Sequence, residues 1–190
     1  MKILISGNPS YGLGQALKEQ FPGADFASRS NGHDLSTSQA QDEFARQSLK
    51  YDVYISCSAL HRFHQTLLVG AVANTWLERK HTGRMIVLGS TADTPVKGML
   101  WMYPIEKKAL RALCRNIGML CLGGPDSPPS GFYITYLSVG YLDTPKTEEK
   151  HPGKKKISVK LIASTIEWLL QQPPSVNIHE MAVDPVQTLD

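Results

Sequence analysis

The chain has 190 residues, of which 42% are hydrophobic and 19% charged, and its formal net charge is +3 at pH 7. This length suits one domain with a substantial core, and the composition is that of an ordinary globular protein. No apolar run is long enough to span a bilayer, and no basic stripe is interleaved with aromatic residues as in binders of single-stranded nucleic acid. We therefore expect one domain over residues 1–190 that binds neither membrane nor nucleic acid.

Short apolar runs alternate with longer segments of helical periodicity. In chain order these are a strand at 2–6, a helix ending near residue 20, a strand at 24–28, a helix at 37–49, a strand at 52–57, a helix at 65–80, a strand at 84–88, a helix at 103–119, a strand at 132–138, a helix around 162–170 and a strand at 181–183. This alternation predicts an α/β fold: a doubly wound, mostly parallel, Rossmann-like sheet with helices on both faces. The charged stretch 145–156 is predicted to be mobile, and its basic run Lys154–Lys156 is more typical of a solvated loop than of a nucleic-acid site.

The N-terminus and the cysteines indicate the compartment. The first residues run straight into a glycine turn, so we expect a strand there rather than a signal peptide. The cysteines Cys57, Cys114 and Cys121 lack metal-ligand spacing and are expected to be reduced. Cys57 is either a reactive thiol or, more typically, a small buried side chain. A cytoplasmic protein without a metal site is expected.

A glycine-rich turn links the first predicted strand to the first helix. It runs Gly7-Asn8-Pro9-Ser10-Tyr11-Gly12-Leu13-Gly14. Glycines let a backbone turn tightly and approach a pyrophosphate at a helix N-terminus, and open parallel sheets bind ligands at the carboxyl ends of their strands. Glycines also occur in connections that bind nothing, so it is the position after the first strand that favours a nucleotide.

Arg29 follows the second predicted strand, where dinucleotide enzymes distinguish NAD from NADP. An NAD enzyme needs an acid here to hold the ribose 2′-hydroxyl, whereas a guanidinium suits a 2′-phosphate. Asp25 lies earlier, inside the predicted strand, and the alternative is that Arg29 is an ordinary surface arginine. If a dinucleotide binds, we expect NADP(H) in preference to NAD(H).

Ser90, Tyr103 and Lys107 are the candidate catalytic residues. Tyr103 and Lys107 are four residues apart, which on a helix places the phenol and the ammonium on one face. The ammonium is expected to lower the phenol pKa from about 10, so that the phenol serves as an acid or base. Such a pair also arises by chance, and the specificity comes from Ser90 at the end of the strand at 84–88, where a hydroxyl can hydrogen-bond a substrate oxygen as charge develops.

With these motifs in this order along the chain, the sequence resembles the short-chain dehydrogenase/reductase family over most of its length. The glycine-rich turn, Arg29, Ser90 and the Tyr-x-x-x-Lys pair are each similar to a motif of the family. The segment Val139–Thr144 is similar to the family's Pro-Gly-x-x-x-Thr except for the proline. Ser56–Ala59 aligns with the family's Asn-Asn-Ala-Gly, and Asp34-Leu35 is similar to its adenine-contacting pair.

The resemblance implies which residues bind the cofactor. They are Gly7, Asn8, Ser10, Tyr11, Gly12, Leu13, Arg29, Ser30, Asp34, Leu35, Ser58, Ala59, Tyr103, Lys107, Gly140, Leu142 and Thr144. The chain departs from the family in having four residues between Gly7 and Gly12, where three are usual. The family's fourth catalytic residue, an asparagine, has no clear counterpart. His61 or His64 would replace it, or both are surface or packing histidines; as a metal pair they lack an acidic or cysteine partner.

The resemblance also implies the activity. A nicotinamide cofactor is implied to exchange a hydride with a carbonyl or alcohol carbon of a small molecule, while Tyr103 moves the proton, Ser90 polarises the oxygen and Lys107 holds the nicotinamide ribose. Reduction is the expected direction. The alternative is an NADP(H)-binding regulator or redox sensor that keeps the fold without turnover.

Substrate walls and assembly follow from the same resemblance. Residues 91–102 and 145–156 are expected to wall the substrate. Met99, Leu100, Trp101 and Met102 would give an apolar side of the pocket, or else belong to the core or to an interface. The family often pairs two of its helices between subunits, so a homodimer or homotetramer is expected.

Overall fold

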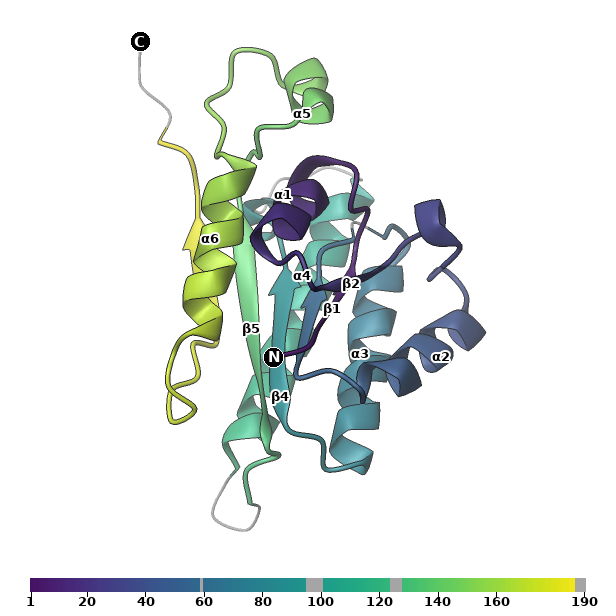
Figure 1. Cartoon of the computed structure of the whole chain (residues 1–190). Coiled ribbons are helices and arrows are strands. Elements are labelled where there is room, and N and C mark those ends of the chain that lie inside the picture. Colours follow the sequence, from purple (N-terminus) through teal and green to yellow (C-terminus); the bar gives the residue numbers. More distant parts are fainter. Residues whose placement is uncertain (59, 95–100, 124–127, 187–190) are drawn as a thin grey trace.

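A six-stranded parallel sheet forms the centre of the molecule (Figure 1). The computed structural model describes residues 1–58, 60–94, 101–123 and 128–186. The strands are β1 (Ile3–Ser6), β2 (Asp25–Ala27), β3 (Val53–Ser56), β4 (Gly83–Leu88), β5 (Phe132–Val139) and β6 (Glu180–Val183). They lie in the order β2-β1-β3-β4-β5-β6, and every neighbouring pair is parallel. The predicted doubly wound sheet is confirmed, and each predicted strand agrees with the observed one to within one residue at either end.

Helices cover both faces of the sheet (Figure 1). On one face lie α1 (Gly12–Gln20) and α6 (Val159–Leu170); on the other lie α2 (Ser38–Ser48), α3 (His64–Glu78) and α4 (Met102–Leu122). Two 3-10 turns, η1 (Arg29–Asn31) and η2 (Thr91–Asp93), follow β2 and β4, and α5 (Pro145–Lys150) follows β5. No helix in the described part of the chain is both long and apolar enough to cross a membrane.

The helix α5 corrects the prediction of a mobile stretch over 145–156. Pro145 occupies its first turn, where a missing N–H costs nothing, and Thr144 caps it by accepting a hydrogen bond from the Thr147 N–H at 3.2 Å. These two local signals start a helix that the charged composition had obscured. After α5 the chain turns back, and Ile157 forms an isolated β-bridge with Leu142.

Successive strand residues alternate between two apolar cores. Ile3 and Ile5 pack with α1 and α6, whereas Leu4 between them packs with α2, α3 and α4. Tyr54 and Ile55 divide in the same way between the two faces. Because helices bury both faces, the strands are nearly continuous hydrophobic runs, which is why the sequence reveals them.

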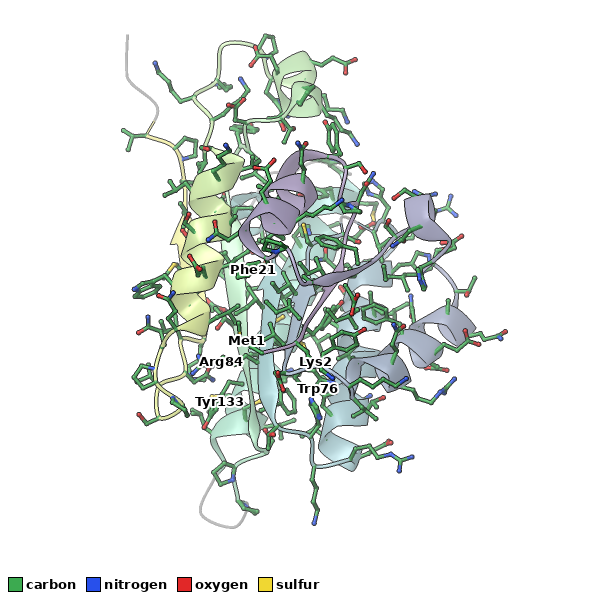
Figure 2. The ribbon with its side chains drawn as sticks, viewed as in Figure 1. Met1, Lys2, Phe21, Trp76, Arg84 and Tyr133 are labelled. Carbon is green, nitrogen blue, oxygen red and sulfur yellow. The ribbon has the colours of Figure 1, made fainter. Side chains whose placement is uncertain are left out.

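The end of the sheet where the strands begin is packed by structural contacts. Figure 2 labels Arg84 and Tyr133, near the starts of β4 and β5, and the Arg84 guanidinium carbon lies 5.8 Å from the Tyr133 ring centroid. Arg84 donates to the Leu169 carbonyl at 3.3 Å and to the Gln172 carbonyl at 2.7 Å, so it satisfies backbone acceptors at the end of α6. The cleft lined by Ser90 and Gly140 lies at the opposite, carboxyl end of the sheet.

The carboxyl end holds the topological switch point. After β1 the chain moves to β2 on one side and then returns to β3 on the other side of β1. The connections leave the sheet in opposite directions there and open a crevice, which is where open α/β sheets bind ligands. The glycine-rich turn follows β1 at this end.

Candidate active site

A cleft of about 900 Å³ opens at the carboxyl ends of β4 and β5. Its volume lies within the usual range of small-molecule and cofactor sites. The walls come from the start of α1, the segment after β4, the first turns of α4, the segment after β5, and α5. Seven of the residues predicted from the sequence line this cleft: Leu13, Ser90, Tyr103, Lys107, Gly140, Leu142 and Thr144.

Ser90 follows the last residues of β4 and is held from two sides. Its hydroxyl accepts a hydrogen bond from the Ala92 N–H at 3.2 Å and hydrogen-bonds Tyr103. A Cβ on Gly89 would lie 2.0 Å from the Tyr136 ring, so only glycine allows the strand end to approach Tyr136 this closely. The Tyr136 hydroxyl in turn accepts from the Ser90 N–H at 3.4 Å. The backbone at Ser90 is thus fixed by a buried phenol from β5.

A buried network anchors that phenol. Tyr136 donates to Asp93 Oδ2 at 2.7 Å, and Arg111 Nη1 lies 3.4 Å from Asp93 Oδ1. Arg111 also pairs with Glu180 of β6 at 3.0 Å. Burial first, and then the hydrogen bond to Asp93, raise the pKa of Tyr136 far above its ordinary value, so its hydroxyl stays protonated. The network ties η2, α4, β5 and β6 together beneath Ser90.

Tyr103 lies in the first turn of α4 and is half-buried beside Ser90. Burial raises its phenol pKa above the ordinary value of 10.0, and the hydrogen bond from Ser90 acts in the opposite direction. The charges of Asp93 and Glu106 raise the pKa further. The expectation of a lowered phenol pKa is therefore wrong for this structure. The Lys107 ammonium does not offset burial because it lies 5.6 Å from the Tyr103 ring centroid and is bound elsewhere.

Lys107 is buried on the same face of α4. Its Nζ donates to Gln65 Oε1 at 2.7 Å and to the Leu88 carbonyl at 3.4 Å. Burial lowers the pKa of Lys107 to about 8, because neutral acceptors compensate only in part for lost hydration. Lys107 is therefore still mainly an ammonium at pH 7 and loses its proton at a lower pH than an exposed lysine.

Gln65 is the site residue that the sequence interpretation missed. It is buried in the first turn of α3, and its amide nitrogen donates to Ser56 Oγ at 3.2 Å and to the Leu88 carbonyl at 3.0 Å while its oxygen accepts from Lys107. A signal was present: Gln65 shares the buried face of α3 with Leu68, Val69 and Val72. A polar residue on such a face needs buried partners, and that pattern would have directed attention to it.

A strained turn places Gln65. Arg62 and Phe63 have φ values of +58° and +61°, which non-glycine residues rarely adopt. The Arg62 N–H donates to Glu106 Oε1 at 2.9 Å, and Glu106 is buried on α4 between Tyr103 and Lys107. The helix α4 thus holds the turn that presents Gln65 to Lys107. The sequence allows His61 or His64 in place of the family's asparagine, but Lys107 donates hydrogen bonds to Gln65 and to the Leu88 carbonyl. His61 lines the cleft, and His64 has a buried Nδ1 without a hydrogen-bond partner among the described residues.

The glycine-rich turn is folded tightly onto α1. A Cβ on Gly14 would lie 2.0 Å from the Asn8 carbonyl oxygen, and Gly12 has a φ of +55°. A Cβ on Gly12 would lie 3.2 Å from Thr144 Cγ2, so the turn closely faces the segment after β5. The Tyr11 hydroxyl also accepts from the Lys146 N–H at 3.0 Å. Together these contacts hold the glycine-rich turn against the segment after β5.

The residues after β2 lie beside that turn rather than in the cleft. Asn8 Oδ1 accepts from the Ser10 N–H at 2.9 Å and from Ser30 Oγ at 3.4 Å, which joins η1 to the glycine-rich turn. Arg29 is exposed at the start of η1. Asp34 is exposed, and hydrogen bonds from Ser36 lower the pKa of its carboxyl group. The neighbouring Leu35 is buried in the core.

The remaining predicted residues follow β3 and β5. A Cβ on Gly140 would lie 2.1 Å from Asp184 Oδ1, which explains the glycine there. Ser58 is half-buried after β3, and Ala59, Met99 and Leu100 lie outside the described residues. Cys57 borders the cleft, yet burial raises its thiol pKa to about 12, so the thiol remains neutral. No group of three metal-ligating side chains occurs within the described ranges.

Comparison with known proteins finds curated oxidoreductases of similar sequence and solved structures of similar fold. No family model matches the chain. An uncharacterized oxidoreductase of Staphylococcus epidermidis is 26% identical over 173 residues, covering 90% of this chain and 69% of that protein. An uncharacterized oxidoreductase of Staphylococcus saprophyticus is 26% identical over 175 residues, covering 92% of this chain and 69% of that protein.

Solved structures resemble the whole fold. A short chain dehydrogenase/reductase family protein superposes with a TM-score of 0.73 at 18% identity, covering 97% of this chain and 95% of that one. An alcohol dehydrogenase of Thermococcus sibiricus, complexed with 5-hydroxy-NADP, has a TM-score of 0.70 at 19% identity and covers 100% of this chain and 99% of that one. The closed form of serine dehydrogenase complexed with NADP+ has a TM-score of 0.71 at 15% identity, covering 96% of this chain and 94% of that one. The expected resemblance is confirmed: this chain has the fold of the short-chain dehydrogenases/reductases.

Proposed function

We propose that the chain is an NADP(H)-dependent oxidoreductase that reduces a carbonyl group, or oxidises an alcohol, of a small molecule. The observation that carries the proposal is the meeting of Ser90, Tyr103 and Lys107 in one cleft at the carboxyl end of the sheet. The description of the relatives as oxidoreductases and the NADP complexes among the structural neighbours support it.

The residues present fit a nicotinamide dinucleotide. The glycine-rich turn leads into the N-terminus of α1, where backbone N–H groups can bind a pyrophosphate, and Leu13 and Thr144 beside this turn line the cleft. The exposed Arg29 beside this turn has the charge and shape to pair with a 2′-phosphate, which favours NADP(H). When bound, the nicotinamide supplies a hydride to a carbonyl carbon or accepts one from an alcohol carbon.

The chain's own residues handle the proton and the substrate oxygen. In reduction, the Tyr103 phenol donates its proton to the oxygen, and its raised pKa keeps it protonated at neutral pH. The Ser90 hydroxyl hydrogen-bonds the same oxygen as negative charge develops on it. The Lys107 ammonium binds a ribose hydroxyl and keeps a positive charge near the phenol. Oxidation needs the phenolate, so we expect oxidation to accelerate as the pH rises.

The variant Tyr103→Phe tests the proposal. Removing the hydroxyl removes the proton donor, and we expect kcat/KM for reduction to fall by about a hundred- to ten-thousandfold while NADPH still binds. The measurement is NADPH oxidation with a panel of aldehydes and ketones, together with the Kd of NADPH. Tyr133→Phe, which changes a phenol at the opposite end of the sheet, is the matched control and should keep full activity. Equal activities in both variants would refute the role of Tyr103.

A cofactor-binding regulator or redox sensor is the second candidate. It is favoured by the raised phenol pKa and by Gln65, an unexpected partner of the Lys107 ammonium. This candidate predicts tight NADPH binding without turnover of any member of the panel, whereas the oxidoreductase predicts turnover that depends on Tyr103. The same set of assays therefore separates the two.

A further inference from the structure

The cleft has a charge pattern that the proposed function does not require. Among the described residues that line it are four lysines and no aspartate or glutamate. Lys107 belongs to the catalytic group, and the backbone of Lys146 binds Tyr11, which places Lys146 at the cofactor end. Lys108 on α4 and Lys150 on α5 remain, on two walls of the same cleft.

The charged side chains of α5 are divided by sign: its lysines line the cleft and its glutamates do not. Four of its six residues are charged, and of these four only the lysines line the cleft, together with the uncharged Thr147. Glu148 and Glu149 do not line it, and Glu148 is paired with Lys156 beyond the helix. The helix as a whole is neutral and nevertheless presents a positive side to the site. His151, directly after α5, also lines the cleft.

Large apolar side chains stand beside these cations. Trp101, Ile105 and Tyr141 line the cleft and remain 51%, 45% and 38% exposed. The Tyr141 ring packs on the ring of His151 with a centroid distance of 4.6 Å, so aromatic rings and the lysines of α5 line the same cleft. Exposed aromatic surface within a cleft is the usual lining for the apolar body of a ligand.

We infer that the substrate is an amphipathic carbonyl compound with an anionic group, a carboxylate or a phosphate, which Lys150 binds while the apolar body lies against Trp101 and Tyr141. The inference rests on the proposed function and names its substrate class. The reacting oxygen lies at Ser90 and Tyr103, and the anion lies toward α5, facing Lys108 across the cleft. Hydrogen bonds to a charged group are stronger than neutral ones, so the anion contributes to affinity and orientation together.

Matched probes test the inference. They are para-acetylbenzoate, its neutral methyl ester and para-acetylphenyl phosphate, each titrated calorimetrically into wild-type protein saturated with NADPH and then assayed for reduction. We expect at least one anion to bind about tenfold or more tightly than the ester. Lys150→Gln should reduce this ratio to near one. Lys154→Gln removes the same charge from an exposed position outside the cleft and should keep the wild-type ratio. The preferred anion shows whether a carboxylate or a phosphate is recognised.

The outcomes separate the inference from the proposed function. Three outcomes would overturn the inference. The first is equal affinity for the ester and the anions, and the second is no binding of any probe. The third is the same ratio of anion to ester affinity in the Lys150→Gln and Lys154→Gln variants. Failure to reduce any carbonyl compound, with the anion preference intact in the calorimeter, would overturn the proposed function alone. Because Lys150 is exposed, the preference should also weaken as salt is added.

Discussion

Lys107 buries an ammonium against an amide oxygen and a backbone carbonyl, and this explains the electrostatics of the site. Gln65 and Leu88 are neutral acceptors, so they only partly replace the hydration that Lys107 loses, and its pKa falls to about 8. Burial moves the neighbouring phenol of Tyr103 in the other direction, towards its neutral form. Desolvation therefore disfavours the charged form of both residues, and the free protein is prepared for proton donation rather than for proton uptake.

Gln65 is expected to act as a positioning residue for Lys107. In Gln65→Leu the ammonium keeps only the Leu88 carbonyl, so we expect kcat/KM for NADPH to fall about ten- to hundredfold. Losing an acceptor for the charged form should also lower the pKa of Lys107 further, and the alkaline fall in kcat/KM should move to lower pH. Gln39→Leu on the outside of α2 is the control. An activity loss with an unmoved pH profile would indicate packing damage only.

Lys107 also links stability to pH. Its pKa is about 8 when folded against 10.5 ordinarily, so between these values the unfolded chain binds a proton that the folded chain has released. Stability from this residue therefore rises with pH across that window and is lowest below it. As the pH rises from about 8 to 10.5, the free energy of unfolding of the wild type should increase by about 3 kcal/mol relative to that of Lys107→Met. Urea unfolding at both limits measures this; parallel pH curves for the two proteins would contradict it.

At the scale of elements, the glycine-rich turn and α1 form one unit. Gly14 packs against the carbonyl of Asn8, and Asn8 in turn binds Ser10 and Ser30. The close approach of turn to helix leaves room for glycine alone at position 14. The additional residue between Gly7 and Gly12 is thus accommodated by a local hydrogen-bonded turn at Asn8.

Gly14→Ala should disrupt this unit. Its Cβ would lie 2.0 Å from a backbone oxygen that no side-chain rotation can move, so we expect a loss of about 2 kcal/mol or more in unfolding free energy and much weaker NADPH binding. Gly23→Ala is the control because nothing lies within 4 Å of its added Cβ. That variant should be neutral or slightly more stable. Thermal unfolding and NADPH titration compare the two, and equal behaviour would show that the turn can rearrange.

At the scale of the whole molecule, the helical layer of α3 and α4 exposes apolar side chains. Met119 and Leu120 on α4 are 67% and 59% exposed, and Leu67 on α3 is 55% exposed. Both helices lie on the same face of the sheet (Figure 1). Scattered apolar residues are ordinary on a surface, but several on adjacent helices are typical of a subunit interface. The homo-oligomer expected from the sequence would use this face.

Sedimentation velocity tests that expectation. We expect a dimer or tetramer for the wild type, and a shift to a smaller species for Met119→Glu, because burying a carboxylate in an interface is costly. Leu161→Glu on α6, on the opposite face of the sheet, is the matched control. Dissociation by the α6 variant alone would move the interface to that face, and a monomeric wild type would refute the assembly.

The sequence by itself determined the order of the strands and of the longer helices, and it identified Ser90, Tyr103 and Lys107, which line one cleft. Because both faces of the sheet are buried, each strand is a run of apolar residues. The ends of such a run are visible in the local sequence, so the strand boundaries could be predicted from residues adjacent in the chain. Tyr103 and Lys107 share a helix face, and Ser90 closes a strand, so their meeting also follows from local periodicity. The place of Arg29 directly after β2 is local in the same sense.

Only the tertiary structure decided how those residues are supported. Gln65 reaches Lys107 across 42 positions of sequence, and the strained Arg62–Phe63 turn that presents it depends on Glu106 of another helix. The direction of the Tyr103 pKa likewise depends on burial, which adjacent residues do not reveal. Which residues meet from distant parts of the chain depends on how the helices and strands pack together. The desolvation that shifts a pKa depends on burial in the folded core. The spacing of sequence motifs reveals neither of these.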